Sequence, residues 1–84
     1  MNDEEYDIID ELYFVTPYSV LKEQTGFTDD ILKQNLITLI RKGFIKVFVT
    51  MNEEAELSKI DMQEKFSNYC YLASKKGLFE HNSR

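Results

Sequence analysis

The sequence predicts an α+β fold, and three observations lead to this prediction. Apolar residues recur every three or four positions in the first half of the chain, as on one face of an amphipathic helix. Residues 45–51 alternate apolar and polar side chains, and residues 68–74 place two tyrosines on one face, as strands do. Gly43 separates the two patterns, at a position where a helix is expected to end. The 84 residues suffice for one domain with a single core.

A first helix is expected over residues 2–14. Asn2 and Glu5 have the spacing of a capping box, in which each side chain bonds the backbone N–H of the other residue. The acids that follow Asn2 suit the positive end of the helix dipole. Residues 14–16 favour β structure and are expected to add a short strand before Pro17. The apolar stripe of this helix consists of Ile8, Ile9, Leu12 and Tyr13.

A short second helix is expected over residues 20–25. Ser19 is the residue type that caps helix N-termini, and it stands just before this segment. Val20 and Leu21 are expected to face the core. Gly26 stands where a helix C-terminus needs a residue with positive φ. Two helices joined by a short turn that contains glycine are typical of a helix-turn-helix.

The third helix is the longest and is expected to begin after Thr28, its N-cap, and to end at Gly43. At roughly 100° per residue, its apolar positions fall on one broad face, which we expect to pack on the core. Asn35 is the one polar residue in this face, and its side chain is expected to bond a neighbouring backbone carbonyl. The predicted core face consists of Ile31, Leu32, Asn35, Leu36, Leu39 and Ile40.

About 16 residues connect the two predicted strands, too many for a tight hairpin turn. Scattered apolar residues in this segment predict an extended wing that is partly anchored and contains a short helical piece. After the second strand, Ser74 is expected to cap a last helix over residues 75–81, which Gly77 is expected to interrupt.

This order of elements resembles bacterial winged helix-turn-helix transcription regulators, and the resemblance covers nearly the whole chain. Residues 32–45, LKQNLITLIRKGFI, resemble the family's long helix, which ends in a Lys-Gly pair followed by apolar residues. Residues 71–77, YLASKKG, are similar to the Tyr-x-Leu-Thr-x-x-Gly run that often follows the wing, with departures at Ala73 and Ser74. The resemblance implies a single winged-helix domain over residues 1–84. Its parts are a helix-turn-helix at about 19–43, a two- to three-stranded antiparallel wing at about 45–74 and a short C-terminal helix.

In the resembling family the third helix enters the major groove of duplex DNA. Carried to this sequence, the resemblance implies that Lys33 contacts phosphate or guanine and that Gln34 makes a paired contact to adenine. The hydroxyls of Thr28 and Thr38 are expected to hold phosphates. The candidate nucleic-acid-binding residues are Thr28, Lys33, Gln34, Thr38, Arg41 and Lys59.

The charge distribution leaves a second interpretation open. The net charge is −5, whereas domains that depend on phosphate contacts are usually basic. Residues 1–16 carry six acids and no base, and residues 50–67 carry five acids against two bases. Asp29 and Asp30 oppose phosphates at the start of the third helix, and Ile37 on its outward side suits a protein contact. The alternative is therefore an acidic module that binds a protein partner, or a second copy of the chain, through the face near Ile37.

Catalytic chemistry is not expected. The sequence has no glycine-rich phosphate loop, no metal-ligand spacing and no nucleophile paired with a second histidine, so we expect no enzyme activity, cofactor or metal. Cys70 is expected to be a buried structural thiol, and His81 an exposed residue of the tail. No apolar run approaches the roughly 20 residues that span a bilayer, and no secretory signal is evident. These features predict a cytoplasmic protein that does not bind membranes.

Overall fold

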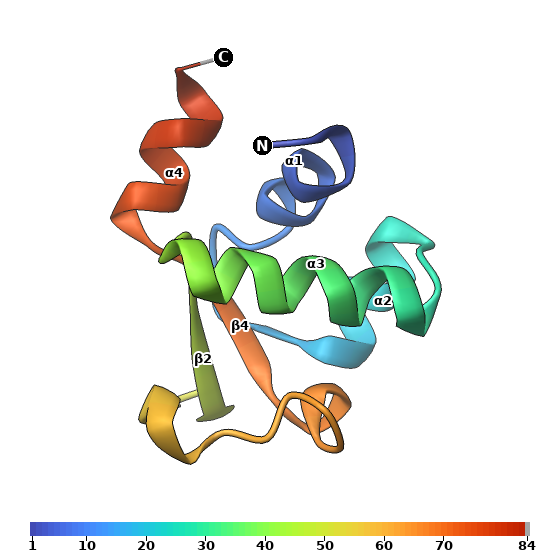
Figure 1. Ribbon diagram of the computed structural model, residues 1–84, viewed down its shortest axis with the longest axis vertical. Coiled ribbons are helices and arrows are strands. Elements are labelled where there is room, and N and C mark those ends of the chain that lie inside the picture. Colours follow the sequence, from blue (N-terminus) through green and yellow to red (C-terminus); the bar gives the residue numbers. More distant parts are fainter. Residues whose placement is uncertain (84) are drawn as a thin grey trace.

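The computed structural model describes residues 1–83, which form an α+β fold of four helices and a four-stranded antiparallel sheet. The sheet has the order β1-β4-β2-β3, so the strand that precedes the second helix pairs with the last strand. The helix α3 crosses in front of β2 and β4, with α1 and α4 above it (Figure 1). The helices are α1 (Asp3–Asp10), α2 (Tyr18–Thr25), α3 (Asp29–Lys42) and α4 (Lys75–Asn82), and the strands are β1 (Thr16–Pro17), β2 (Ile45–Thr50), β3 (Glu53–Glu54) and β4 (Cys70–Ala73).

The predicted capping box at the start of α1 is confirmed. The side chain of Asn2 accepts the backbone N–H of Glu5 at 2.7 Å, and the carboxylate of Glu5 accepts the backbone N–H of Asn2 at 3.0 Å. The helix ends at Asp10, so the prediction that it extends to residue 14 is wrong. The carbonyl of Leu12 accepts the backbone N–H of Ala73 at 2.8 Å. The chain at Leu12 is therefore hydrogen-bonded to β4 and does not continue the helix.

The second helix begins earlier than the sequence indicates. Its N-cap is Pro17 and not Ser19, because the backbone N–H of Tyr18 already donates to the carbonyl of Tyr69 across the sheet. With this start, Leu21 is fully buried, whereas Val20 points away from the core and is exposed. The prediction that Val20 faces the core is therefore wrong. The predicted positive φ at Gly26, which ends the helix, is confirmed at 71°.

The third helix follows its prediction closely. Thr28 caps it by accepting the backbone N–H of Ile31 at 3.3 Å, and Gly43 ends it with a φ of 76°. The side chain of Asn35 donates to the backbone carbonyl of Ile31 at 2.8 Å, so this buried amide bonds a neighbouring carbonyl as predicted. The fully buried residues of the helix are Leu32, Leu36 and Leu39. Together with Val47 and Tyr71 of the sheet, these leucines belong to the core cluster.

Only the first half of β2 is buried as its alternation predicts. Ile45 and Val47 lie in the core, and Val47 pairs with Tyr71 of β4. The register with β3 shifts between Phe48 and Thr50, and Val49, which lies at this bulge, is 46% exposed. Burial thus ends at the bulge, although the apolar pattern of the sequence continues.

The segment between β3 and β4, residues 55–69, is not an extended wing. Only Glu53–Glu54 pairs with β2, and the chain then folds back through two 3₁₀ turns, Leu57–Lys59 and Phe66–Asn68. The tyrosines of the last strand region hold it there. The hydroxyl of Tyr69 accepts the backbone N–H of Asp61 at 2.9 Å, and the hydroxyl of Tyr71 donates to the carbonyl of Phe66 at 2.6 Å. The short helical piece is confirmed, but the extended shape is wrong.

The last helix is capped by Ser74 as predicted, since its hydroxyl accepts the backbone N–H of Gly77 at 3.0 Å. Gly77 does not interrupt the helix. It is buried against the backbone of Phe44, just before β2, and a Cβ atom placed on it would lie 2.0 Å from the carbonyl oxygen of Phe44. Glycine at this position therefore allows α4 to approach the start of β2 closely.

The far end of α4 packs on α1 through His81. Its Nε2 atom lies 2.5 Å from the carboxylate of Asp10, and its Nδ1 atom lies 3.4 Å from the hydroxyl of Tyr13. The His81 side chain is 13% exposed, so the prediction of an exposed tail residue is wrong. The sequence pattern could not reveal this contact, because it joins residues about 70 positions apart.

Candidate nucleic-acid interface

The outward face of α3 is the candidate interface that the sequence indicates. Asp30, Gln34 and Arg41 are exposed on it, opposite the buried leucines, and Thr38 is half-buried at its edge. The helix lies at the front of the molecule, and no other helix or strand passes in front of its middle (Figure 1). The face therefore combines one amide, one cation and one carboxylate within reach of solvent.

The two predicted threonine contacts have local partners. Thr28 caps α3, so its hydroxyl oxygen lies against the backbone N–H of Ile31. The hydroxyl of Thr38 donates to the carbonyl of Gln34 at 3.0 Å. A phosphate needs a donor, and Thr38 already gives its hydroxyl hydrogen to this carbonyl.

The 55–69 segment runs along one flank of α3. The Nζ atom of Lys33 lies 5.5 Å from the ring centroid of Phe66, close enough for a cation–π contact. Ile37 is half-buried and lines an open groove of about 310 Å³ between the helix and this segment. The groove is lined by Ile37, Ile40, Ile60, Asp61, Met62 and Gln63. Lys59 lies in the first 3₁₀ turn of the segment, where it forms an exposed ion pair with Glu56 at 3.5 Å.

The acidic start of α3 is partly neutralised. The carboxylate of Asp29 accepts the hydroxyl of Tyr18 at 2.6 Å and lies 3.0 Å from the Nζ atom of Lys22. The hydrogen bond from Tyr18 and the charge of Lys22 hold the pKa of Asp29 below its ordinary value, so this carboxylate is ionised at neutral pH. Asp30 beside it is exposed. This end of the helix therefore presents little net positive charge to a phosphate.

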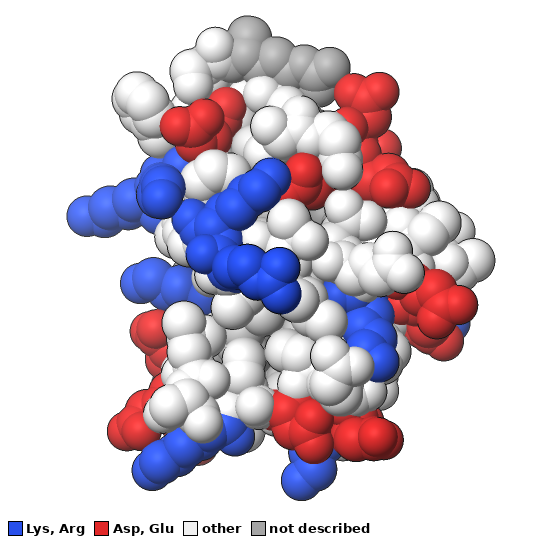
Figure 2. All heavy atoms as spheres, viewed as in Figure 1, with Lys and Arg blue, Asp and Glu red and all other residues white. Residues whose placement is uncertain are grey.

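Positive charge gathers instead at the opposite end of α3. Figure 2 shows Lys and Arg side chains collected over the C-terminal end of α3 and the start of α4. We call this surface the basic junction: it consists of Arg41, Lys42, Lys46, Lys75 and Lys76. The Nζ atom of Lys76 donates to the backbone carbonyl of Lys42 at 3.0 Å. The Nζ atoms of Lys42 and Lys76 lie 5.9 and 5.4 Å from the ring centroid of Phe44.

Sequence reasoning selected only Arg41 from this group. The sequence does contain two pairs of adjacent basic residues that could have indicated this surface: Arg-Lys at the end of one predicted helix and Lys-Lys at the start of another. Their meeting depends on the docking of α4 against the start of β2. That contact has no sequence periodicity of its own.

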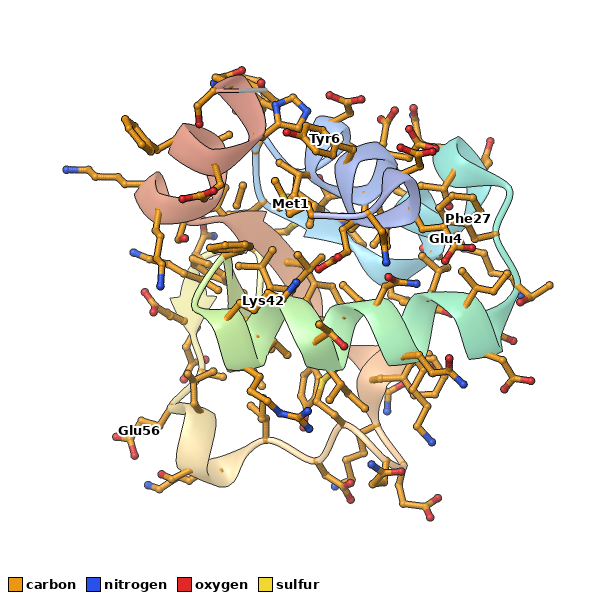
Figure 3. The ribbon with its side chains drawn as sticks, turned by 45° about the horizontal axis from the view of Figure 1, so that its top comes forward. Met1, Glu4, Tyr6, Phe27, Lys42 and Glu56 are labelled. Atoms are coloured by element: carbon orange, nitrogen blue, oxygen red, sulfur yellow. The ribbon has the colours of Figure 1, made fainter. Side chains whose placement is uncertain are left out.

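One carboxylate enters the basic junction. Within residues 1–83, Glu5 is the only acid that forms an ion pair with it, at 3.1 Å from the Nζ atom of Lys42. Figure 3 shows Lys42 on the side of α3 that faces α1. Burial raises the pKa of Glu5, but the backbone N–H of Asn2 and the Lys42 ammonium outweigh it, so its pKa lies below the ordinary value. Glu5 is therefore a buried, ionised partner of Lys42.

Other kinds of site find little support in the part of the chain that the structure describes. Residues 1–83 contain no group of three or more His, Cys, Asp or Glu side chains placed to hold a metal ion. Cys70 is buried, and burial raises the pKa of its thiol, as expected for a structural cysteine. No helix among these residues is both long and apolar enough to cross a membrane.

Comparison with models of protein families, with curated proteins and with solved structures found no match to this chain.

Proposed function

We propose that the chain is a winged-helix domain that binds duplex DNA through α3. The observation that carries this proposal is the position of α3, a 14-residue helix whose outward face is exposed at the front of the molecule. The order of elements, with β1 paired to β4 and β4 to β2, supports the winged-helix assignment. A helix presented in this way has the dimensions that fit the major groove.

Gln34 and Arg41 are the residues of this face that suit base and backbone contacts. A glutamine amide can bond the major-groove edge of adenine, and an arginine can bond guanine or phosphate. The β3 region does not assist, because Glu53 and Glu54 are exposed there and repel phosphates. Binding is therefore expected to be of modest affinity and strongly dependent on salt.

The test is the anisotropy of a fluorescently labelled, random-sequence DNA duplex titrated with the protein at low and moderate salt. The proposal predicts binding at low salt, with the logarithm of the association constant falling linearly with the logarithm of salt concentration. Folded protein in excess that leaves the anisotropy unchanged at low salt would refute it.

A matched pair of variants tests the face itself. Gln34→Glu adds a negative charge to the outward face of α3, and Gln24→Glu adds the same charge to the exposed surface of α2. Repulsion between the new carboxylate and nearby phosphates predicts about a tenfold loss of affinity for Gln34→Glu and a much smaller loss for Gln24→Glu. Equal losses would show that α3 is not the contact.

A second candidate function is self-association through the groove beside α3. The observation in its favour is the apolar lining of that groove, formed by Ile37, Ile40, Ile60 and Met62. If a second copy covers it, sedimentation velocity will show a dimer at high protein concentration, and Ile37→Asp will abolish it. The control is Val20→Asp, which places the same charge at an exposed apolar residue of α2. A wild-type protein that stays monomeric, or an Ile37→Asp variant that still dimerises, counts against this candidate.

A further inference from the structure

We propose that the basic junction binds the phosphate backbone of duplex DNA, so that α4 and the start of β2 form part of the interface together with α3. This inference rests on the proposed function. It places the strongest phosphate contact at the C-terminal end of α3, away from the helix N-terminus and from the β3 region.

The backbone of the basic junction is rigidly built. The backbone N–H of Ser74 donates to the carbonyl of Phe44 at 2.9 Å, and the hydroxyl of Ser74 donates to the carbonyl of Gly43 at 2.7 Å. Gly77 packs directly on the backbone of Phe44. These contacts fix the first turn of α4, and with it Lys75, beside the end of α3. Because the backbone that carries these cations is already ordered, binding has to order only their side chains.

Most cations of the basic junction lack a counter-charge. Arg41, Lys46 and Lys75 form no ion pair with any residue of the described chain, 1–83, and all three are exposed. Glu5 neutralises only Lys42. These neighbouring cations repel one another locally, and a bound polyanion relieves that repulsion. Cations that are free in the unbound protein can neutralise phosphates without first breaking protein ion pairs.

The shape of the charged surface suits an extended polyanion. The basic side chains fan out over the molecule and do not converge on one point, while acids lie above and below them (Figure 2). A small anion needs donors that converge, whereas a phosphate backbone presents one charge after another along a line. The acids on either side, and Asp30 at the other end of α3, repel phosphates and so restrict the DNA backbone to the basic junction.

Two double variants with identical charge changes test the inference. Lys46→Gln/Lys75→Gln removes two cations from the basic junction, and Lys59→Gln/Lys65→Gln removes two exposed cations from the 55–69 segment. Circular dichroism checks that both are folded, and the anisotropy titration is repeated across a range of salt concentrations. The junction variant is expected to lose about tenfold or more in affinity at low salt, and its log–log salt slope should fall by about 1.8, because each phosphate contact contributes about 0.9. Lys59 is a candidate contact from the sequence, but its ammonium already faces the carboxylate of Glu56. The inference therefore predicts that the Lys59→Gln/Lys65→Gln variant keeps a slope close to that of the wild type.

The outcomes separate this inference from the proposed function. If the wild type binds DNA and both variants keep its slope, the inference is overturned while DNA binding by α3 stands. A larger loss for Lys59→Gln/Lys65→Gln also overturns it, because the 55–69 segment is then the phosphate contact. If the wild type does not bind, the proposed function fails and the inference fails with it.

Discussion

Replacing Gly77 with alanine tests how α4 is held on the sheet. A Cβ atom at this position would lie 2.0 Å from the carbonyl oxygen of Phe44 and 2.9 Å from its carbonyl carbon. Both are backbone atoms of Phe44, the residue just before β2, so neither can rotate aside as a side-chain tip would. The helix and the strand must therefore separate by about 1 Å or more before ordinary van der Waals contact is restored.

Two opposing effects set the size of the change. Alanine in a helix interior is favoured over glycine by about 0.5–1 kcal/mol, so without the contact this substitution would stabilise the protein. Overpacking against a fixed neighbour costs about 1–3 kcal/mol. Separation also stretches the bonds from Ser74 to Phe44 and Gly43, each worth about 1 kcal/mol. The clash outweighs the propensity gain, and we expect a net loss of about 2 kcal/mol in the free energy of unfolding.

The assay is urea unfolding followed by circular dichroism. With a slope of about 1–2 kcal/mol per M for a domain of this size, the midpoint of Gly77→Ala should fall by about 1–2 M. The matched control is Gly26→Ala, where a Cβ atom meets nothing within 4 Å and only the φ of 71° opposes alanine. That variant should lose about 1 kcal/mol. A Gly77→Ala protein as stable as the wild type would refute the close packing of α4 on Phe44.

Two further predictions concern buried polar groups. Glu5→Gln should lower the free energy of unfolding by about 1–2 kcal/mol at neutral pH, because it removes the charge that faces Lys42. The folded-state pKa of Glu5 is depressed, so its contribution is present above the ordinary pKa of 4.5 and disappears as pH falls through the folded value. Urea unfolding at pH 7 and pH 3 should therefore show a difference only at pH 7, and a difference that persists at pH 3 would contradict this assignment. Tyr71→Phe leaves the carbonyl of Phe66 without its 2.6 Å partner and should cost about 1–2 kcal/mol. Hydrogen exchange should accelerate in the 55–69 segment, and unchanged exchange would show that the hydroxyl does not anchor it.

The helices show what the sequence by itself determined. The caps at Asn2, Thr28 and Ser74 and the positive φ values at Gly26 and Gly43 are all observed. Each depends on residues within three or four positions, because a cap bonds the backbone of its own first turn. The buried face of α3 was predictable for the same reason, since its residues lie one helical turn apart.

The tertiary structure decided the features that join distant segments. The alternation of β2 could not show that burial ends at Val49, because Val49 lies at a bulge that arises from the pairing of β2 with β3. Residues 55–69 fold back because Tyr69 and Tyr71 form hydrogen bonds with the backbone of this segment. The tyrosines in the sequence do not show which backbone groups they will bond.

Gly77 and the basic junction show the same division most clearly. In the sequence, a glycine within a helical segment indicates an interruption, whereas the fold uses it for close contact between α4 and the start of β2. That contact also brings the side chain of Lys76 to the backbone carbonyl of Lys42, more than 30 positions earlier in the chain. The sequence thus determined the helices and the caps at their ends, because these depend on hydrogen bonds and dihedral angles within one helical turn. The packing of the last helix, α4, decided where this acidic chain presents a positively charged surface.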